Sequence, residues 1–333
     1  MTPSLAIWMD ALSLLAAASV GALAQRHSVC HVRAIEALWR RRDLRPLQGQ
    51  TMAVAFAMLA AALASAGVAG VQHAPVPVAA GAVPALIGGL LFGVGAAANG
   101  GCSVSTLNRL AQGEGAMVAT LAGFVLGVVP AASLQWTDMA GLWPVPTRYD
   151  PAWLTSDAAP WRLFATFAIL WLGSALVSTR LRGAALTWRE VAAHLHPRGM
   201  APLGVLAGLL YAVQGPWAYT GTLRDLAGQT GNAVDTPMAW RFSLAAALLA
   251  GVVGSAWRSG TVAWRMPSRT ATLQHLLAGM LMGVGAALVG GGNDSVLLNQ
   301  LPMGAPAALL AWPAMCAGIA VAMAAQSLRT PAG

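Results

Sequence analysis

Long apolar segments recur along the whole chain and alternate with short polar ones. Residues 51–71, for example, form 21 positions without a charge, and a helix of that length covers the roughly 30 Å hydrocarbon core of a bilayer. We expect the first segment to be a retained span, because no basic region with a cleavage site precedes it. The pattern predicts an all-α polytopic membrane protein with about nine transmembrane helices, at residues 4–24, 51–71, 82–99, 115–135, 161–180, 200–214, 240–257, 271–290 and 305–326.

Four further segments are too short to cross a bilayer. Each follows an apolar segment and carries polar residues, at about 29–39, 102–112, 219–227 and 293–301. Backbone that is not helical is tolerated at membrane depth only where protein or a water-filled cavity satisfies its polar groups. We therefore expect four short re-entrant half-helices that face the interior.

One Gly-rich motif occurs twice. Residues 89–101 read GLLFGVGAAANGG and residues 279–291 read GMLMGVGAALVGG, and nine of these thirteen positions are identical at an offset of 190. Each copy ends at a diglycine and is followed by a polar stretch. Duplicated, broken apolar helices are typical of inverted-topology repeats in membrane carriers. The predicted organisation is a first inverted repeat at 1–136, a linker at 137–198 with a periplasmic loop, span five and a basic loop, and a second repeat at 199–333, which together give an hourglass-like shape.

Composition supports the membrane class. Charged residues make up 9% of the chain, against about 25% in an average soluble protein. The net charge of +8 comes from Arg alone and sits in short loops, which argues against a nucleic-acid partner. Three Cys do not suggest a disulfide framework. A chain without Lys has no Walker motif for ATP, and we expect no metal and no cofactor.

The Arg distribution predicts an orientation. When the nine spans alternate, twelve Arg fall on one side, which the positive-inside rule makes cytoplasmic. This places the N-terminus in the periplasm and the C-terminus in the cytoplasm of a bacterial inner membrane. These Arg lie at 40, 41, 42, 45, 180, 182, 189, 198, 258, 265, 269 and 329. The Trp- and Pro-rich loop 136–160 falls on the opposite side.

The breaks carry the candidate chemistry. The diglycine before Cys102 ends a helix readily, and the next half-helix points unpaired N–H groups and a partial positive charge at the break, where an anion is favoured. A thiol adds a weak donor and a soft, polarisable surface. Cys30 lies in a second break. A buried free Cys is also a common apolar filler, so this alternative stands beside the first.

The second-half break reads Gly290-Gly291-Gly292-Asn293-Asp294. We expect Asp294 to cap the half-helix or to take up a proton during transport. Amide side chains at the breaks could solvate an anion or satisfy the broken backbone, and both alternatives stay open. Arg109 and Glu114 are expected to pair near the cytoplasmic rim. The predicted substrate path consists of Cys30, Cys102, Asn99, Gly101, Ser103, Gly291, Gly292, Asn293 and Asp294, supported by Arg33, Arg109, Asn108, Asn299 and Cys316.

Three segments resemble a known family. GGCSVSTLNRLAQGE and GMLMGVGAALVGGGNDSVLLNQLP resemble the two signature segments of the YeeE/YedE family of bacterial inner-membrane proteins, and SVCHVRAIEALW resembles its N-terminal Cys-bearing segment. The resemblance implies uptake of sulfur-containing anions, passed as thiosulfate between Cys thiols, and in some members work with a small TusA-like sulfur carrier. Cys30 and Cys102 match the first two family Cys. Gly292 stands where the family has its third.

The leading hypothesis is a permease, and not an enzyme, that imports thiosulfate or a related sulfur-containing anion through a Cys-lined path. The alternative is a membrane scaffold that carries persulfide sulfur to a TusA-like sulfurtransferase. A pore for a small neutral solute is disfavoured by the half-helix dipoles and the thiols.

The predicted orientation can be tested by labelling. Single Cys residues introduced in the loops 40–45 and 258–269 should both be shielded from a membrane-impermeant maleimide in intact cells. A Cys introduced in the loop 136–160 should react. Labelling of the two basic loops from opposite faces would contradict the inversion of the two halves.

Overall fold

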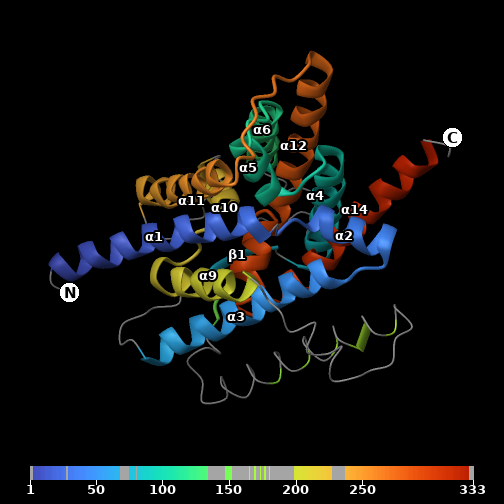
Figure 1. The fold of residues 1–333 in the computed structure, drawn as a ribbon. Helices are drawn as coiled ribbons and strands as arrows, with labels where there is room; N and C mark the ends of the chain where they lie inside the picture. The colour runs from blue at the N-terminus through green and yellow to red at the C-terminus, as the bar shows by residue number, and fades with distance from the viewer. Residues whose placement is uncertain are drawn as a thin grey trace.

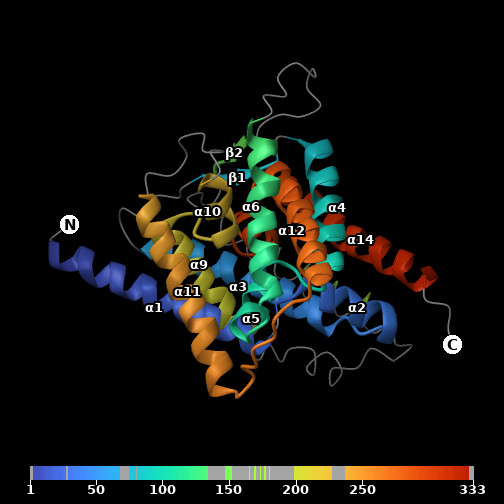
Figure 2. The same ribbon diagram turned by 90° about the horizontal axis from the view of Figure 1, so that it is seen from above.

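The structure, a computed structural model, describes residues 3–27, 29–67, 75–79, 81–133, 147–151, 199–226 and 237–329, together with six isolated residues between 165 and 180. These residues are mostly helical (Figures 1 and 2). Most of the predicted fifth span, 161–180, and most of the loop 136–160 lie outside the described residues.

The described chain forms thirteen helical segments and two short strands. In chain order they are α1 (Pro3–His27), α2 (His31–Arg41), α3 (Arg45–Gly67), β1 (Val76–Val78), α4 (Ala82–Asn99), α5 (Ser103–Ala111), α6 (Ala116–Ser133), β2 (Thr147–Tyr149), α9 (Met200–Gln214), α10 (Tyr219–Leu226), α11 (Met238–Arg258), α12 (Arg269–Val289), α13 (Asn293–Ser295), η3 (Val296–Gln300) and α14 (Pro306–Arg329).

Six helical stretches of the described chain are long and apolar enough to cross a membrane. They are Ile7–Arg41, Arg45–Ser65, Ala82–Ala111, Met238–Arg258, Arg269–Gln300 and Pro306–Leu328. The helix α6 contributes a shorter apolar stretch, Ala116–Ala131. The chain is therefore a multi-pass α-helical membrane protein, while the count of nine spans stays a prediction.

Short helices occupy all four of the short polar segments. Three of them, α2, α5 and α10, are α-helices of 11, 9 and 8 residues. The fourth differs from the expectation, because the three-residue α13 passes directly into the π-helix η3. A π-helical turn inserts an extra residue into a helix and is often found at functional sites. The two breaks therefore differ in backbone geometry even though their sequences are related.

Glycines let the long helices approach backbone to backbone. A Cβ at Gly123 or Gly279 would collide with a carbonyl oxygen across the seam between α6 and α12. Gly89 and Gly93 face α14 from α4 in the same way, and Gly204 and Gly208 face α3 from α9. Small residues at such spacing are the usual means of close helix packing in lipid. Packing is therefore the role of these glycine pairs.

The two Gly-rich helices α4 and α12 pack against each other in opposite directions. Gly88 faces residues 285–289, whereas Gly95, further along α4, faces residues 278–282. The other close contacts also join a helix of the first half to a helix of the second: α6 packs on α12, α4 on α14, α1 on α11 and α3 on α9. These contacts form equivalent pairs when α4 corresponds to α12, α6 to α14, α1 to α9 and α3 to α11.

Loops at each end of the molecule are joined by backbone hydrogen bonds. The strands β1 and β2 pair antiparallel, with Pro77 opposite Arg148. At the other end of the molecule, residues 112–115 pair with residues 263–265, and the Arg265 N–H donates to the Gly113 carbonyl at 2.9 Å. Figure 2 shows the strands at the top of the view, away from the end of α11. Each pairing joins loops that the sequence places on the same side, although it did not predict strands.

The close seam between α6 and α12 gives a stability prediction. Gly279→Ala should lower the melting temperature of the purified protein in detergent, because the new Cβ would meet the Thr120 carbonyl oxygen. Overpacking of this kind costs about 1–3 kcal/mol. The control is Gly254→Ala on α11, where an added Cβ meets nothing within 4 Å. Equal melting temperatures for the two variants would contradict this account of the seam.

Candidate functional site

The beginnings of the short helices converge at the centre of the molecule. The long helix α4 ends at Gly100, whose φ of 71° is left-handed, and α5 begins three residues later. The long helix α12 ends in the same way at Gly290, with φ 90°, before α13 begins. Glycine adopts this conformation without a steric penalty, and the left-handed residue lets the chain turn out of the helix. Two broken helices thus present new N-termini to one region.

Side chains connect the equivalent positions of the two breaks. Ser103 and Asn293, which are 190 residues apart, are bonded twice: the Ser103 backbone N–H donates to Asn293 Oδ1 at 3.1 Å, and its hydroxyl donates to the same oxygen. The Tyr219 hydroxyl, from the start of α10, donates to the Ser103 carbonyl at 2.7 Å. His31 Nδ1, from the start of α2, lies 3.2 Å from Asn293 Nδ2. All four short helices therefore meet in one polar cluster, which we call the central cluster.

The thiols of Cys30 and Cys102 meet in the same region. Their side chains lie close enough to interact, and Cys102 Sγ lies 3.8 Å from the Val29 carbonyl oxygen. Each Cys occupies the N-cap position of its short helix in extended conformation, and neither thiol caps the helix. Both are buried, at 2% and 0% exposure. The two thiols are therefore free of a capping role and lie together beside two helix N-termini.

The carboxylate of Asp294 bonds to two other short helices. It accepts from the Thr220 backbone N–H at 3.2 Å and from the Thr220 hydroxyl, and the Ser103 hydroxyl also donates to it at 3.1 Å. We expected Asp294 to cap the helix that it begins. These bonds show that it caps the neighbouring helix α10, so a carboxyl group already occupies one helix N-terminus of the central cluster.

Thr220 fills the space beside Gly292 and was missed from the sequence. Its hydroxyl accepts from the Gly292 N–H at 2.9 Å, and a Cβ at Gly292 would lie 2.9 Å from the Thr220 methyl group. The backbone of Gly292 is extended, with φ −76°, so only space opposes a side chain there. Thr220 therefore stands where a third thiol would have to fit.

Asn99 satisfies broken backbone. Its Nδ2 donates to the Gly101 carbonyl at 2.9 Å and to Thr106 Oγ1 at 3.0 Å, and its Oδ1 accepts from the Thr120 hydroxyl at 2.7 Å. His275 Nδ1 also lies 2.8 Å from that oxygen. Asn99 thus satisfies one carbonyl of the broken backbone, while its place on the substrate path stays a prediction.

The supporting residues divide into two groups. Arg109 pairs with Glu114 at 2.7 Å, as expected, and donates to the Asn99 carbonyl at 2.7 Å. Asn108 donates to the Ala24 carbonyl at 3.2 Å, which ties α5 to α1. Arg33 is exposed on the outer face of α2. Its guanidinium is solvated there, so the side chain does not support the central cluster.

Cys316 and Asn299 lie outside the central cluster. Cys316 is half-buried on α14 and packs against the hydrophobic core. One turn earlier on the same helix, Trp312 contacts the ring of His31 edge to face at 6.0 Å. Asn299 lies on η3 and lines a separate pocket. Within the described chain, no group of three His, Cys, Asp or Glu side chains is placed to hold a metal ion.

The broken helices, apolar spans and central cluster define a multi-pass membrane protein with an interior polar site. Over residues 26–321 the chain matches the sulphur transport family. It therefore belongs to that family, which includes the YeeE/YedE proteins, and is a transporter of sulfur compounds. No curated protein matches the chain.

The contact between Gly292 and Thr220 can be tested with a double-mutant cycle. Gly292→Cys should lower the melting temperature, since its side chain would overlap Thr220, at a cost of about 1–3 kcal/mol. The same substitution should cost less in a Thr220→Ala background than in the intact chain, because Thr220→Ala removes the overlapping methyl and hydroxyl groups. Thr220→Ala alone should lower the melting temperature by removing the hydroxyl bonds to Gly292 and Asp294. Additive effects of the two substitutions would show that they do not share one space.

Proposed function

We propose that the chain imports thiosulfate, or a related sulfur-containing anion, across the bacterial inner membrane. The path runs between the two broken helices and past the thiols of Cys30 and Cys102. The observation that supports this proposal is that two buried thiols, neither of which caps a helix, lie together beside the N-termini of the short helices.

The helix N-termini supply the attraction for an anion. An anion that leaves water for a membrane interior loses its hydration at a steep cost. Asn293 and Asp294 oxygens already accept from the Ser103 and Thr220 N–H groups, so it is the dipoles and the remaining N–H groups of the short helices that replace part of that hydration. Ser103, Tyr219 and Thr220 add hydroxyl groups around the same point. Groups of this strength stabilise an anion without holding it so tightly that release stalls.

The thiols supply the preference for sulfur. A thiol is a weak donor and a polarisable surface, which suits the soft terminal sulfur of thiosulfate better than the oxygens of sulfate. Cys102 is fully buried and Cys30 is 2% exposed. This burial favours contact with a small permeating ion over docking of a protein such as a TusA-like carrier, which needs an accessible thiol.

Two features support the proposed inverted arrangement. The helices α4 and α12 run in opposite directions, and the paired loops join segments that the Arg distribution puts on one side. In this arrangement the strands face the periplasm, residues 112–115 and 263–265 face the cytoplasm, and the four short helices re-enter toward the narrow centre of an hourglass. The N-terminus is periplasmic and the C-terminus cytoplasmic.

The proposal predicts thiol-dependent uptake. Cells that lack other importers should accumulate radiolabelled thiosulfate when they express the chain. Cys102→Ala should reduce the initial rate at least tenfold, because the buried path loses its soft contact, and Cys30→Ala should act similarly.

Cys316→Ser is the matched control, since it changes the third thiol outside the central cluster, and it should retain most of the uptake. Expression and membrane insertion of each variant would be checked by blotting. Full uptake by Cys102→Ala would reject the thiol path, and no uptake by the intact chain would reject the cargo.

A further inference from the structure

We infer that Arg224 and Arg241 form a second anion site, which receives the sulfur-containing anion on the strand side of the central cluster. The identity of the anion rests on the proposed function; the site itself rests on a pocket, its charge and its unused donors. Nothing in the sequence pattern singled out either arginine as part of a site.

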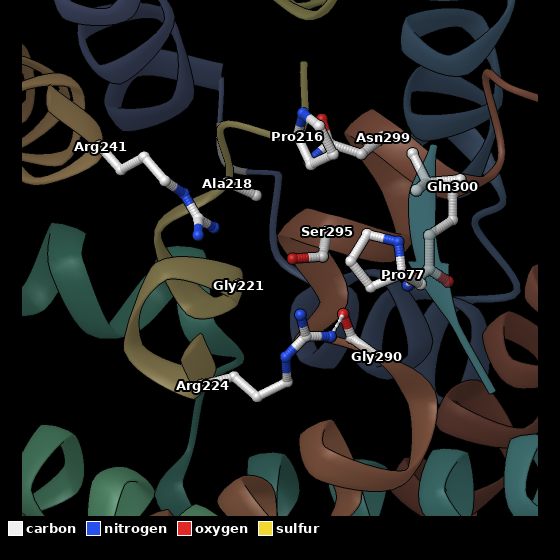
Figure 3. Close-up of a pocket in the computed structure, with 11 residues that line it drawn as sticks. Pro77, Pro216, Ala218, Gly221, Arg224, Arg241, Gly290, Ser295, Asn299 and Gln300 are labelled. Atoms are coloured by element: carbon white, nitrogen blue, oxygen red, sulfur yellow. Dashed lines mark hydrogen bonds between the residues drawn. The ribbon is translucent and has the colours of Figure 1, made fainter. Parts of the chain in front are cut away.

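The pocket lies between α10, α11, η3 and the strand β1. The space inside it takes about one water molecule, so an anion that binds there must displace that water and move the lining side chains apart. Figure 3 shows the guanidinium groups of Arg241 and Arg224 directed into it from two different helices, with Ser295 between them. The remaining lining residues are Val76, Pro77, Pro216, Ala218, Gly221, Gly290, Asn299 and Gln300.

Among the described residues, two arginines line the pocket and no carboxylate does. Asp225 pairs with both arginines: its Oδ1 accepts from Arg224 Nη2 at 2.5 Å and its Oδ2 accepts from Arg241 Nη1 at 2.5 Å. Arg224 is 3% exposed and Arg241 is 4% exposed. Two buried guanidinium groups thus share one carboxylate among the described residues. A buried charge without a counter-ion is costly, so an anion that enters this pocket gains stabilisation from the charge that Asp225 leaves over.

Arg241 also has unused hydrogen-bonding capacity. Its Nε has no hydrogen-bond partner among the described residues, although the side chain is buried. Arg224, by contrast, is held in place, because its Nη1 donates to the Gly290 carbonyl at 2.6 Å. An arginine fork matches the oxygens of a small oxyanion well. Arg241 is therefore the residue that binds the ion, and Arg224 adds charge from a fixed position.

The pocket adjoins the central cluster. The Ser295 hydroxyl, which lines the pocket, lies 3.1 Å from the Thr220 hydroxyl, and Thr220 bonds to Asp294. The hydroxyl groups of Ser295 and Thr220 thus lie between an anion bound by Arg241 and the start of α10. The arginines and the thiols are thus two successive binding sites on the proposed path.

Binding measurements on the intact chain test this site. The purified protein in nanodiscs is titrated with thiosulfate and with sulfate by calorimetry. Arg241→Gln should weaken the binding of thiosulfate at least tenfold, and Arg241→Lys, which keeps the charge, should lose less. Arg258→Gln is the matched control, because it removes the same charge from the exposed end of the same helix α11 and should leave binding within twofold.

A second measurement needs no substitution. Phenylglyoxal modifies arginine, and mass spectrometry follows each position separately in the intact protein. Thiosulfate should slow the modification of Arg241 severalfold and leave the modification of Arg258 unchanged. Equal rates at Arg241 with and without the anion, or normal binding by a folded Arg241→Gln variant, would overturn the inference.

The results separate this site from the proposed function. If Arg241→Gln binds and imports thiosulfate as the intact chain does, the second site is wrong and the import proposal stands. If the intact chain binds sulfate through Arg241 but imports no sulfur-containing anion, the site stands and the import proposal fails.

Discussion

Interrupting a helix inside an apolar molecule frees peptide groups that must find new partners, and the centre of this protein is built around that requirement. Each interruption leaves carbonyl groups at one end and N–H groups at the other. Arginines serve the carbonyl ends: Arg109 donates to the Asn99 carbonyl and Arg224 to the Gly290 carbonyl. The N–H ends receive Asn293 and Asp294 oxygens. The polar site is thus a direct result of breaking the helices.

The two interruptions are related in sequence and differ in the burial of their charges. Glu114 pairs with Arg109 at 2.7 Å and lies 4.0 Å from the exposed Arg265, whereas Asp225 pairs with two buried arginines, Arg224 and Arg241. Buried charges are screened less by water and salt than exposed ones, so the second-half end attracts an anion more strongly. In the proposed orientation that end faces the periplasm, where an imported anion would be collected.

Repetition and apolar length made much of the fold predictable. The bounds of α4 and α9 are those predicted, because diglycine and Gly-Pro sequences end helices and can be recognised in the sequence. The thiols of Cys30 and Cys102 were expected on one path, and the structure brings them together. The family resemblance, confirmed over residues 26–321, rested on the same segments.

Other parts depended on contacts between distant segments. Thr220 and Tyr219 looked like ordinary residues of a short helix, and only the arrival of α13 and α5 beside them reveals their hydroxyl contacts. The same is true of Arg241, which lies at position four of a long apolar helix. Arg33 was misjudged for the opposite reason, since closeness to Cys30 in sequence said nothing of the face of α2 on which it lies.

The seams between the long helices limit how the molecule can move. The helix α14 packs on α4, and α12 packs on α6. Glycine contacts therefore hold helices of one half closely against helices of the other. Rotation of one half against the other as a rigid unit would break both of these contacts at once. On the proposed path, an anion would therefore pass the centre through small displacements of the short helices, with the long helices of the two halves staying in contact.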